Sequence, residues 1–409
     1  MANPAHPDVV VIGGGIVGTS AAAFLAGAGA SVVLVEREGL ASGASGANSG
    51  VVQHPFDPVL AGLYHETVDL YRDLAAGSNA FPFPSSPVGL LYVSPDEAAV
   101  RRQAASILAE FPDLEIEVVG GTRLRELDRA VGEDLWACRV DIGYPVMPGA
   151  STYAYATLAE SRGAVIRLGR SAELAIEGET VVGVDIDGRR LAAGSVLAAA
   201  GPWTPALLDP TRHWAPIQPR WGVVVELELE GRPTHVLEEA GIEAILDTMP
   251  GGGVAEPVPA GIADAARPTE DRPDIDEVEF SLVPLPGASA VGSTFLALEP
   301  DPTAWVESIL ERATRFVPAV VDAPIRGVRA CARPQSIDGR PLVGAVPGRR
   351  GLYVCAGHGP WGISTGPASA RLVADLIQDE ASAVPPELDP ARFGIPAVAG
   401  PGRPRHGSI

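Results

Sequence analysis

The chain has 409 residues, of which 46% are hydrophobic and 20% are charged, enough apolar material for the cores of two packed domains. Its formal net charge of −21 argues against nucleic acid or an anionic membrane surface as a partner, because both repel an acidic protein. All 30 basic residues are arginine, which excludes any catalytic step through a lysine, such as a Schiff base.

The first predicted unit, Val9 to Glu36, has the order strand, glycine-rich turn, helix, strand and acid. Gly13 permits a tight turn, Gly15 lets a pyrophosphate approach the backbone, and Gly18 lets the helix pack closely on the strand. The helix N-terminus attracts phosphate. Glu36, 21 residues after Gly15, is placed to accept a hydrogen bond from a ribose hydroxyl. The unit therefore predicts a dinucleotide site.

The same segment has two other interpretations. Residues 9–35 carry no charge, so a membrane helix is one alternative, but six glycines and apolar runs confined to the two ends argue against it. A secretory signal is disfavoured because residues 1–8 contain no Lys or Arg. We therefore expect no membrane span. Three widely spaced cysteines give no disulfide or zinc pattern, and no other metal-binding spacing is visible, so we expect no metal site and a cytoplasmic location.

Helix and strand patterns alternate through the middle of the chain. The apolar run that ends at Gly201 is typical of a buried parallel strand that stops at the ligand edge of a sheet. The predicted elements up to this point are a Gly/Ser/Ala loop at 42–50, helices at 57–74, 96–110 and 151–161, strands at 89–93, 164–168 and 194–200, and a hairpin at 174–186.

The second half adds antiparallel patterns and a second glycine loop. Strands at 223–229 and 279–283 alternate like half-solvated antiparallel strands. Residues 251–277 between them are rich in Gly, Pro and acid, which fits either a mobile lid or a disordered insertion. A helix at 305–316, strands at 342–345 and 352–356, a loop at 357–362, a helix at 365–377 and a loose tail at 394–409 follow.

These patterns predict an α/β protein of two domains, in which a Rossmann-like dinucleotide-binding domain is interleaved with an antiparallel-sheet substrate domain. The cofactor domain is predicted at 1–75, 146–215 and 325–393, and the substrate domain at 76–145 and 216–324.

A second cofactor element lies near the C-terminus. The loop GHGPWG feeds a helix whose start carries Ser364, Thr365 and Pro367, which suit a cap and first turn. The N-terminus of this helix would face a negatively charged group. The N1–C2=O edge of a reduced flavin is such a group, because negative charge accumulates there.

Five segments in order resemble the glycine oxidase, sarcosine oxidase and D-amino-acid oxidase family of FAD enzymes. They are VIGGGIVG with VVLVERE, SGASGANSGV, LAAAGPW, RPQSIDGRP and GHGPWGIS, and the resemblance covers nearly the full length. It implies FAD as cofactor and oxidation of the C–N bond of a small amino acid or secondary amine. The implied cofactor-binding residues are Gly13, Gly15, Ile16, Val17, Gly18, Glu36, Arg37, Ala44, Ser45, Ser49, Gly50, Val51, Gly201, His358, Gly359, Pro360, Trp361, Gly362, Ile363 and Ser364.

The resemblance also implies substrate-binding residues. Arg333 matches the arginine that pairs with a substrate carboxylate, and its planar fork suits a bidentate pair. The alternative for Arg333 is an ordinary surface arginine. His54 and Trp361 are further candidates for substrate contact, and the alternative for His54 is a turn residue before Pro55. His54 and His358 are the candidates for acid–base chemistry.

Two departures from the family pattern leave choices open. Monomeric sarcosine oxidases carry a lysine where this chain has Trp361 and use a lysine beside the flavin for reaction with oxygen, whereas this chain has none. Either His54 or His358 assists oxygen, or electrons leave to another acceptor. Cys331 lies at the spacing of covalent flavin attachment in sarcosine oxidases, but RPQSIDGRP is closer to non-covalent members, and a buried thiol is the alternative.

Two other functions remain as alternatives: an FAD-dependent dehydrogenase of hydroxy acids or polyols, and a flavin-carrying subunit of an electron-transfer complex. The sequence does not determine the substrate, its stereochemistry or the oligomeric state.

Overall fold

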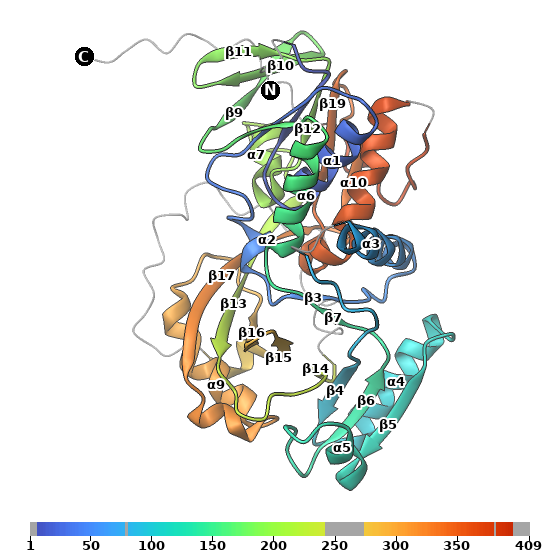
Figure 1. The fold of residues 1–409 in the computed structure, drawn as a ribbon, viewed down its shortest axis with the longest axis vertical. Coiled ribbons are helices and arrows are strands. Elements are labelled where there is room, and N and C mark those ends of the chain that lie inside the picture. Colours follow the sequence, from blue (N-terminus) through green and yellow to red (C-terminus); the bar gives the residue numbers. More distant parts are fainter. Residues whose placement is uncertain (1–5, 78–80, 242–273, 380–381, 396–409) are drawn as a thin grey trace, which may run out of the picture.

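The computed structural model describes residues 6–77, 81–241, 274–379 and 382–395. Two large sheets organise them (Figure 1). The first is a six-stranded sheet whose neighbouring strands are all parallel except β18 and β19, which are antiparallel. In sheet order its strands are β18 (Leu342–Ala345), β19 (Leu352–Ala356), β12 (Ser195–Ala198), β1 (Val9–Ile12), β2 (Val32–Val35) and β8 (Val165–Arg167).

Alternate residues of β1 point to opposite faces of this sheet. Val9 and Val11 join one core cluster and Val10 and Ile12 join another, as the period of two in a strand requires. The first face is covered by α1 (Ile16–Gly27), α3 (Pro58–Ala76), α6 (Ala150–Ser161) and α10 (Gly362–Gln378). The other face packs against a three-stranded sheet of β9 (Ala172–Glu177), β10 (Thr180–Ile186) and β11 (Arg189–Ala192).

The second sheet has eight strands and occupies the lower half of Figure 1. Its pairs are antiparallel except that of β14 with β4. In sheet order its strands are β17 (Ile325–Ser336), β13 (Ile217–Leu227), β16 (Ala288–Thr294), β15 (Val278–Leu285), β14 (Val236–Glu239), β4 (Leu90–Ser94), β6 (Trp136–Val140) and β5 (Ile116–Gly120).

The expectation of half-solvated strands in this sheet was wrong. Val223, Val224 and Val225 are consecutive in β13 and all buried, because both faces of the strand are covered. Val223 and Val225 pack in one cluster with α9 (Val306–Thr314), and Val224 packs in another on the opposite face. Helices α4 (Glu97–Glu110) and α5 (Gly121–Leu127) contact the strands at the other end.

Short elements lie between these strands and helices. They are α2 (Ala44–Ala47), β3 (Val51–Val52), β7 (Tyr144–Pro145), α7 (Thr204–Leu208), and the 3-10 turns η1 (Gly201–Trp203), η3 (Ile275–Glu277), η4 (Pro302–Trp305), η5 (Pro318–Asp322), η6 (Gly359–Trp361) and η7 (Pro390–Phe393).

The fold class is confirmed: a parallel sheet built from the start, middle and end of the chain accompanies an antiparallel sheet built from the segments between. Residues 325–336, assigned to the cofactor domain, form β17 of the eight-stranded sheet. Most of the predicted insertion at 251–277 and of the tail at 394–409 lies outside the described residues. Among the helices that are described, none combines the length and apolarity that a membrane crossing needs.

Candidate active site

One cavity of about 800 Å³ connects the carboxyl edge of the parallel sheet with the antiparallel sheet. Its wall contains the glycine turn before α1, the start of α10, and strands β13 to β17. The sequence-predicted residues that line it are Gly13, Gly15, Ile16, Val17, Glu36, Arg37, Ala44, Ser45, Ser49, Val51, Gly201, Cys331, Arg333 and the run His358–Ser364.

The glycine turn fits a dinucleotide. Gly13 has a φ of +120°, and a Cβ on it would overlap the carbonyl oxygen of Ala199. Only glycine satisfies both conditions. Helix α1 then starts at the cavity wall with no acid in its first turn, so its positive end is not neutralised there.

Gly18 and Gly50 are described but do not line the cavity. A Cβ on Gly18 would overlap the carbonyl oxygen of Gly13, so Gly18 acts in close packing of α1 on the turn. Gly50 has a φ of +86° and lies against the carbonyl oxygen of Val146. Both glycines shape the backbone around the cavity from outside its wall.

Glu36 lies at the end of β2 and contacts the glycine turn. One carboxylate oxygen, Oε2, accepts a hydrogen bond from the Gly14 backbone N–H at 2.6 Å, and Oε1 accepts one from the Glu38 N–H at 2.9 Å. The next residue, Arg37, places its guanidinium 4.0 Å from the ring centroid of Trp203. These residues form one charged and aromatic end of the cavity.

The start of α10 forms another part of the wall. The helix begins at Gly362, earlier than predicted, and Ser364 and Thr365 lie in its first turns without capping it; Pro367 is inside the helix. Ser364 Oγ instead accepts a hydrogen bond from the Gln53 backbone N–H at 2.9 Å. The α10 N-terminus therefore faces the cavity without a side-chain cap from the described residues.

His358 is the most informative polar group here. Its side chain is buried, and its Nε2 has no hydrogen-bond partner among the described residues. Burial lowers the pKa of His358 to about 4, so the imidazole is neutral at physiological pH. An unpaired buried nitrogen on a cavity wall calls for a polar ligand atom. With the two helix N-termini and the glycine turn, it makes the cavity suitable for a flavin dinucleotide.

Arg333 is held rigidly on the antiparallel-sheet side. Nη1 donates to the Thr294 carbonyl oxygen at 2.9 Å, and Nη2 donates to Ser293 Oγ at 2.5 Å. Its Cζ lies 4.3 Å from the ring centroid of Phe295. The guanidinium also packs against Gly222, where a Cβ would overlap it. Arg333 is therefore a half-buried cation on a cavity wall rather than an exposed surface arginine.

The charge near Arg333 is only partly balanced. Burial lowers the pKa of Arg333, and the nearby Cys331 and Glu279 oppose that shift. Glu279 is itself buried, which raises the pKa of its carboxyl to about 7 despite the attraction of Arg333. Its Oε2 has no hydrogen-bond partner within the described chain. A half-ionised carboxyl leaves Arg333 able to bind an added carboxylate.

Cys331 lines the cavity and is a free thiol. Its Sγ lies 3.8 Å from the Ala44 carbonyl oxygen. Burial raises the pKa of the thiol, opposed by Arg333 and Arg329. Because the thiolate is the nucleophile, this environment does not activate Cys331.

His54 is not brought to the cavity. It is described and buried, but it is not a lining residue, and its ring lies among Phe56, Tyr64, His65 and Phe111. Its Nδ1 accepts a hydrogen bond from the Phe56 N–H at 3.1 Å, a local contact of the kind expected for a turn residue before Pro55. Burial and the nearby His65 lower its pKa to about 4. His54 lies away from the cavity because its ring packs among these neighbouring rings, and we assign it no catalytic role.

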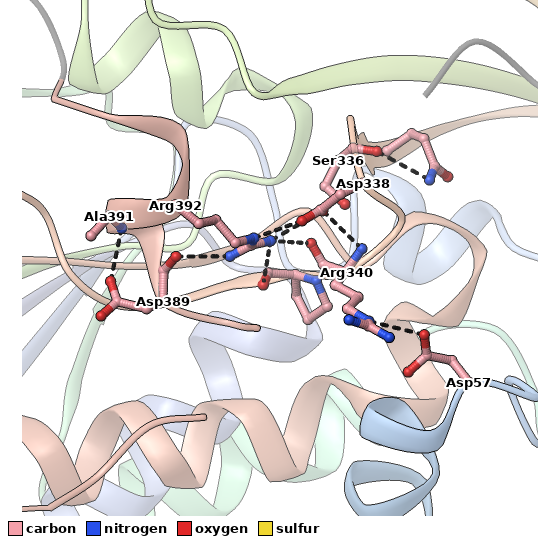
Figure 2. Close-up of polar contacts among 9 residues, drawn as sticks. Asp57, Ser336, Asp338, Arg340, Asp389, Ala391 and Arg392 are labelled. Atoms are coloured by element: carbon pink, nitrogen blue, oxygen red, sulfur yellow. Dashed lines mark hydrogen bonds and ion pairs between the residues drawn. The ribbon is translucent and has the colours of Figure 1, made fainter. Parts of the chain in front are cut away.

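Residues of the RPQSIDGRP segment bind to the start of α3 and to η7 (Figure 2). Both carboxylate oxygens of Asp338 accept hydrogen bonds from Arg392, at 2.7 and 3.2 Å. Arg340 donates to Asp57 Oδ2 at 2.9 Å, and Asp57 caps the start of α3. Asp338 and Arg340 thus fix the end of β17 to α3 and to η7, and this part of the motif is structural.

Several lining residues had no sequence signal. They come from strands of the antiparallel sheet and from the segment after α2, and only long-range pairing brings them to the cavity. They are Gln53, Trp221, Glu238 and Glu299.

Comparisons with known proteins agree with this geometry. The family described as FAD dependent oxidoreductase matches residues 8–376. Glycine oxidase from Pseudomonas aeruginosa is 26% identical over 94% of this chain and 97% of its own. A D-amino acid dehydrogenase from Cereibacter sphaeroides is 28% identical over 62% of this chain and 50% of its own.

The fold comparison gives the same result. The structure of glycine oxidase from Bacillus cereus matches with a TM-score of 0.74 and 25% identity, covering 91% of this chain and 95% of that one. The family match spans both sheets and the cavity between them. The protein is therefore an oxidoreductase that uses FAD, and it belongs to the DAO family of FAD dependent oxidoreductases.

Proposed function

We propose that this enzyme oxidises the C–N bond of a small amino acid or secondary amine, and that Arg333 binds the substrate carboxylate. The observation that carries this proposal is a half-buried guanidinium on the wall of the same cavity as the glycine turn and the α10 start. The similarity to glycine oxidase, at 26% identity, supports the reaction class. The substrate is oxidised to an imine, which water hydrolyses.

The roles of the chain's own residues follow from their positions. Bound FAD supplies the hydride acceptor. Arg333 orients the substrate through its carboxylate, and its contacts with Ser293 and Thr294 prevent the guanidinium from following a misplaced ligand. The N-termini of α1 and α10 supply positive potential to the cofactor. Positioning and electrostatics, rather than a strong base, are the contributions assigned to the protein.

Within this proposal the cofactor-binding set stays as predicted from the sequence, apart from the backbone roles of Gly18 and Gly50. Glu36 and Arg37 are proposed for the adenosine end, and His358 to Ser364, including Trp361, for the flavin end. The flavin is proposed to be held non-covalently, because the environment of Cys331 favours a neutral thiol. The three buried free cysteines suit the reducing cytoplasm as the proposed location.

One observation favours a second candidate, the dehydrogenase of hydroxy acids. His358 Nε2 is unpaired and lines the cavity, as a base for a hydroxyl proton would have to be. Its pKa of about 4 makes it a weak base, which places this candidate second.

Anaerobic reduction of the bound flavin tests the proposal. Amino acids and secondary amines are expected to bleach the flavin absorbance, and hydroxy acids are not. Arg333→Ala is expected to raise KM for carboxylate substrates at least 100-fold while the flavin stays bound, since a charge-assisted bidentate pair is lost. Arg326→Ala, an exposed arginine on the same strand, is the matched control. An unchanged KM in Arg333→Ala would reject the assignment of Arg333.

The chain contains no lysine that could assist the reaction of the reduced flavin with oxygen. Two electron acceptors are therefore compared, oxygen and another compound. Turnover of the purified chain with oxygen is compared with turnover with an artificial acceptor. Fast flavin reduction with slow reoxidation by oxygen would identify a dehydrogenase, and inactivity with both acceptors would favour the electron-transfer subunit.

A further inference from the structure

Glu279 is an acid that the proposed reaction leaves unused. It lies in β15, it is buried, and its Oε2 has no hydrogen-bond partner within the described chain. It is not among the residues that line the cavity, so it does not touch a ligand there. A buried carboxylate without a hydrogen-bond partner is costly when it is ionised, so either a nearby cation or a bound proton has to compensate its charge.

The nearby cation is Arg333. Strand β15 pairs with β16, and Val278, the residue before Glu279, lies opposite Thr294. Thr294 and the adjacent Ser293 are the residues that accept hydrogen bonds from the Arg333 guanidinium. The attraction between the two charges opposes the effect of burial on the pKa of each group. The sheet therefore places an unpartnered acid beside the cation that is proposed to bind the substrate.

The other charges around Glu279 are paired, hydrogen-bonded or exposed. Glu239 of β14 repels the carboxylate, but Arg312 of α9 binds Glu239 at 2.6 and 3.0 Å and attracts Glu279 in turn. Glu238, also of β14, accepts a hydrogen bond from a side-chain amide. Arg333 is therefore the strongest electrostatic partner of Glu279. The acids of η3 and α9 are exposed, and solvent screens them; they are Asp274, Asp276, Glu277, Glu307 and Glu311.

A carboxylate bound to Arg333 changes this balance. One guanidinium then has two negative groups beside it, the ligand in the cavity and Glu279 in the protein. An ionised Glu279 repels the ligand, and the ligand removes part of the compensation that Glu279 received from Arg333. Both effects favour the protonated form of Glu279 in the complex. A group that binds protons more strongly in the complex makes the ligand affinity fall as the free group ionises.

We propose that Glu279 is a positioning residue that acts through Arg333: it takes up a proton from solvent when a carboxylate binds, and in its ionised form it weakens carboxylate binding. The ionised carboxylate compensates the guanidinium in the empty site, and its protonation leaves the guanidinium charge to the ligand. This inference rests on the carboxylate-binding role proposed for Arg333 and adds the group that regulates its affinity.

The pH dependence of carboxylate binding to the holoenzyme tests the proposal. Burial raises the pKa of Glu279 to about 7, so it is mostly protonated at pH 6 and mostly ionised at pH 8.5. Propanoate has no amine and stays ionised over this range. Its Kd, measured by the change in flavin absorbance, is expected to rise about fivefold or more from pH 6 to 8.5, and by at most about 10-fold per pH unit.

Two other groups near the site titrate outside this range. The pKa of His358 is about 4, and burial raises the pKa of the Cys331 thiol above its ordinary value. Glu279→Gln imitates the protonated carboxyl and is expected to keep the Kd within about twofold of the wild-type value at pH 6 throughout. Glu277→Gln is the matched control, because it removes an exposed acid two residues earlier, and it is expected to keep the wild-type pH profile. Thermal melts at each pH show whether the variants are folded.

Proton uptake by the wild type keeps the test independent of the folding of Glu279→Gln. Calorimetric titrations with propanoate at pH 7.5 in HEPES and in Tris, which differ in ionisation enthalpy, give the number of protons bound per ligand. An uptake of roughly 0.3 to 1 proton is expected. Binding without proton uptake would contradict the proposed role of Glu279.

Kinetics with amino-acid substrates provide a second measure if propanoate binds too weakly. The ratio of the KM of the wild type to the KM of Glu279→Gln is expected to rise with pH, because the ionisation of the substrate itself cancels in the ratio. The corresponding kcat ratio is expected to stay within about twofold, since Glu279 does not touch the reacting atoms. A purely structural role would not give a KM ratio that follows the pH.

The outcomes separate this inference from the proposed function. Carboxylate binding with the same pH dependence in the wild type and Glu279→Gln, or with none in either, would overturn the role of Glu279 and leave the role of Arg333 intact. An unchanged KM in Arg333→Ala would reject the carboxylate site itself, and the inference about Glu279 with it.

Discussion

Gly222 of β13 lies directly against the guanidinium of Arg333 in the neighbouring strand β17, and a Cβ at Gly222 would overlap the guanidinium. The side chain of Arg333 is thus positioned by the absence of a side chain opposite it. Gly222 lies in a regular antiparallel pair, so it is not needed there for an unusual backbone conformation. Its role is to leave space for the Arg333 guanidinium.

The first prediction is that Gly222→Ala displaces Arg333 without removing its charge. KM for a carboxylate substrate is expected to rise at least 10-fold, because misalignment weakens the bidentate pair, while the thermal stability changes little. Steady-state kinetics and a thermal melt measure the two effects. Gly327→Ala is the matched control, since no atom lies within 4 Å of a Cβ at that position of β17. Equal KM values in Gly222→Ala and wild type would show that the guanidinium tolerates the methyl group.

The second prediction concerns the attachment of the flavin. Burial raises the pKa of Cys331, so the thiol stays protonated and forms no bond to the cofactor. Acid precipitation of the wild-type holoenzyme is expected to release all FAD into the supernatant, and Cys331→Ser is expected to behave identically. Flavin retained in the wild-type pellet but released from Cys331→Ser would establish a covalent link.

The sequence predicted those parts of the site in which neighbouring residues act together. The turn from Gly13 to Gly18 and the loop from His358 to Ser364 each bring a glycine-rich backbone and a helix start to the cavity within a few residues. Such local geometry depends on the backbone conformations that glycine allows and on the helix dipole, both of which a sequence pattern reveals. Arg333 was found only through its motif.

The parts that were missed depend on long-range pairing. Glu238 reaches the cavity because β14 pairs with β15. The sequence between these two strands does not indicate the register in which they pair. Glu279 is buried, and its sequence neighbours do not show this burial. The opposite error occurred at His54, where proximity to the flavin loop in sequence suggested the cavity but four rings enclose the imidazole. Packing of distant segments decides all three cases.

The third prediction concerns Glu36, whose carboxylate holds the Gly14 N–H at 2.6 Å. Glu36→Ala is expected to weaken FAD binding by about 10- to 100-fold, because it removes a charge-assisted hydrogen bond that shapes the turn as well as the proposed ribose contact. Flavin fluorescence during titration of the apoprotein measures the Kd. Glu126→Ala, which removes the partner of an exposed ion pair with Arg123 outside the cavity wall, is expected to change the Kd less than threefold. Similar losses in both variants would contradict a specific role for Glu36.

The fourth prediction concerns the stability of the apoprotein in acid. Burial lowers the pKa of His358 to about 4, and burial with the nearby His65 lowers the pKa of His54 to about 4. In the unfolded chain an imidazole has a pKa near 6.5, so between about pH 6.5 and 4 the unfolded state binds more protons than the folded state. The stabilising contribution of each neutral histidine is complete above about pH 6.5 and is lost as the pH falls through about 4.

Each of these histidines is expected to add up to about 1.4 kcal/mol per pH unit to the slope of the unfolding free energy in that window. Urea titrations of the apoprotein between pH 4 and 8 measure the slope. His54→Asn keeps an acceptor for the Phe56 N–H but removes the titrating ring, so the slope should fall by about one proton while activity at pH 8 is retained. Because His54 lies outside the cavity wall, a loss of flavin reduction at pH 8 in a folded His54→Asn enzyme would contradict its placement in the aromatic cluster. An unchanged slope would show that its imidazole is not kept neutral by burial.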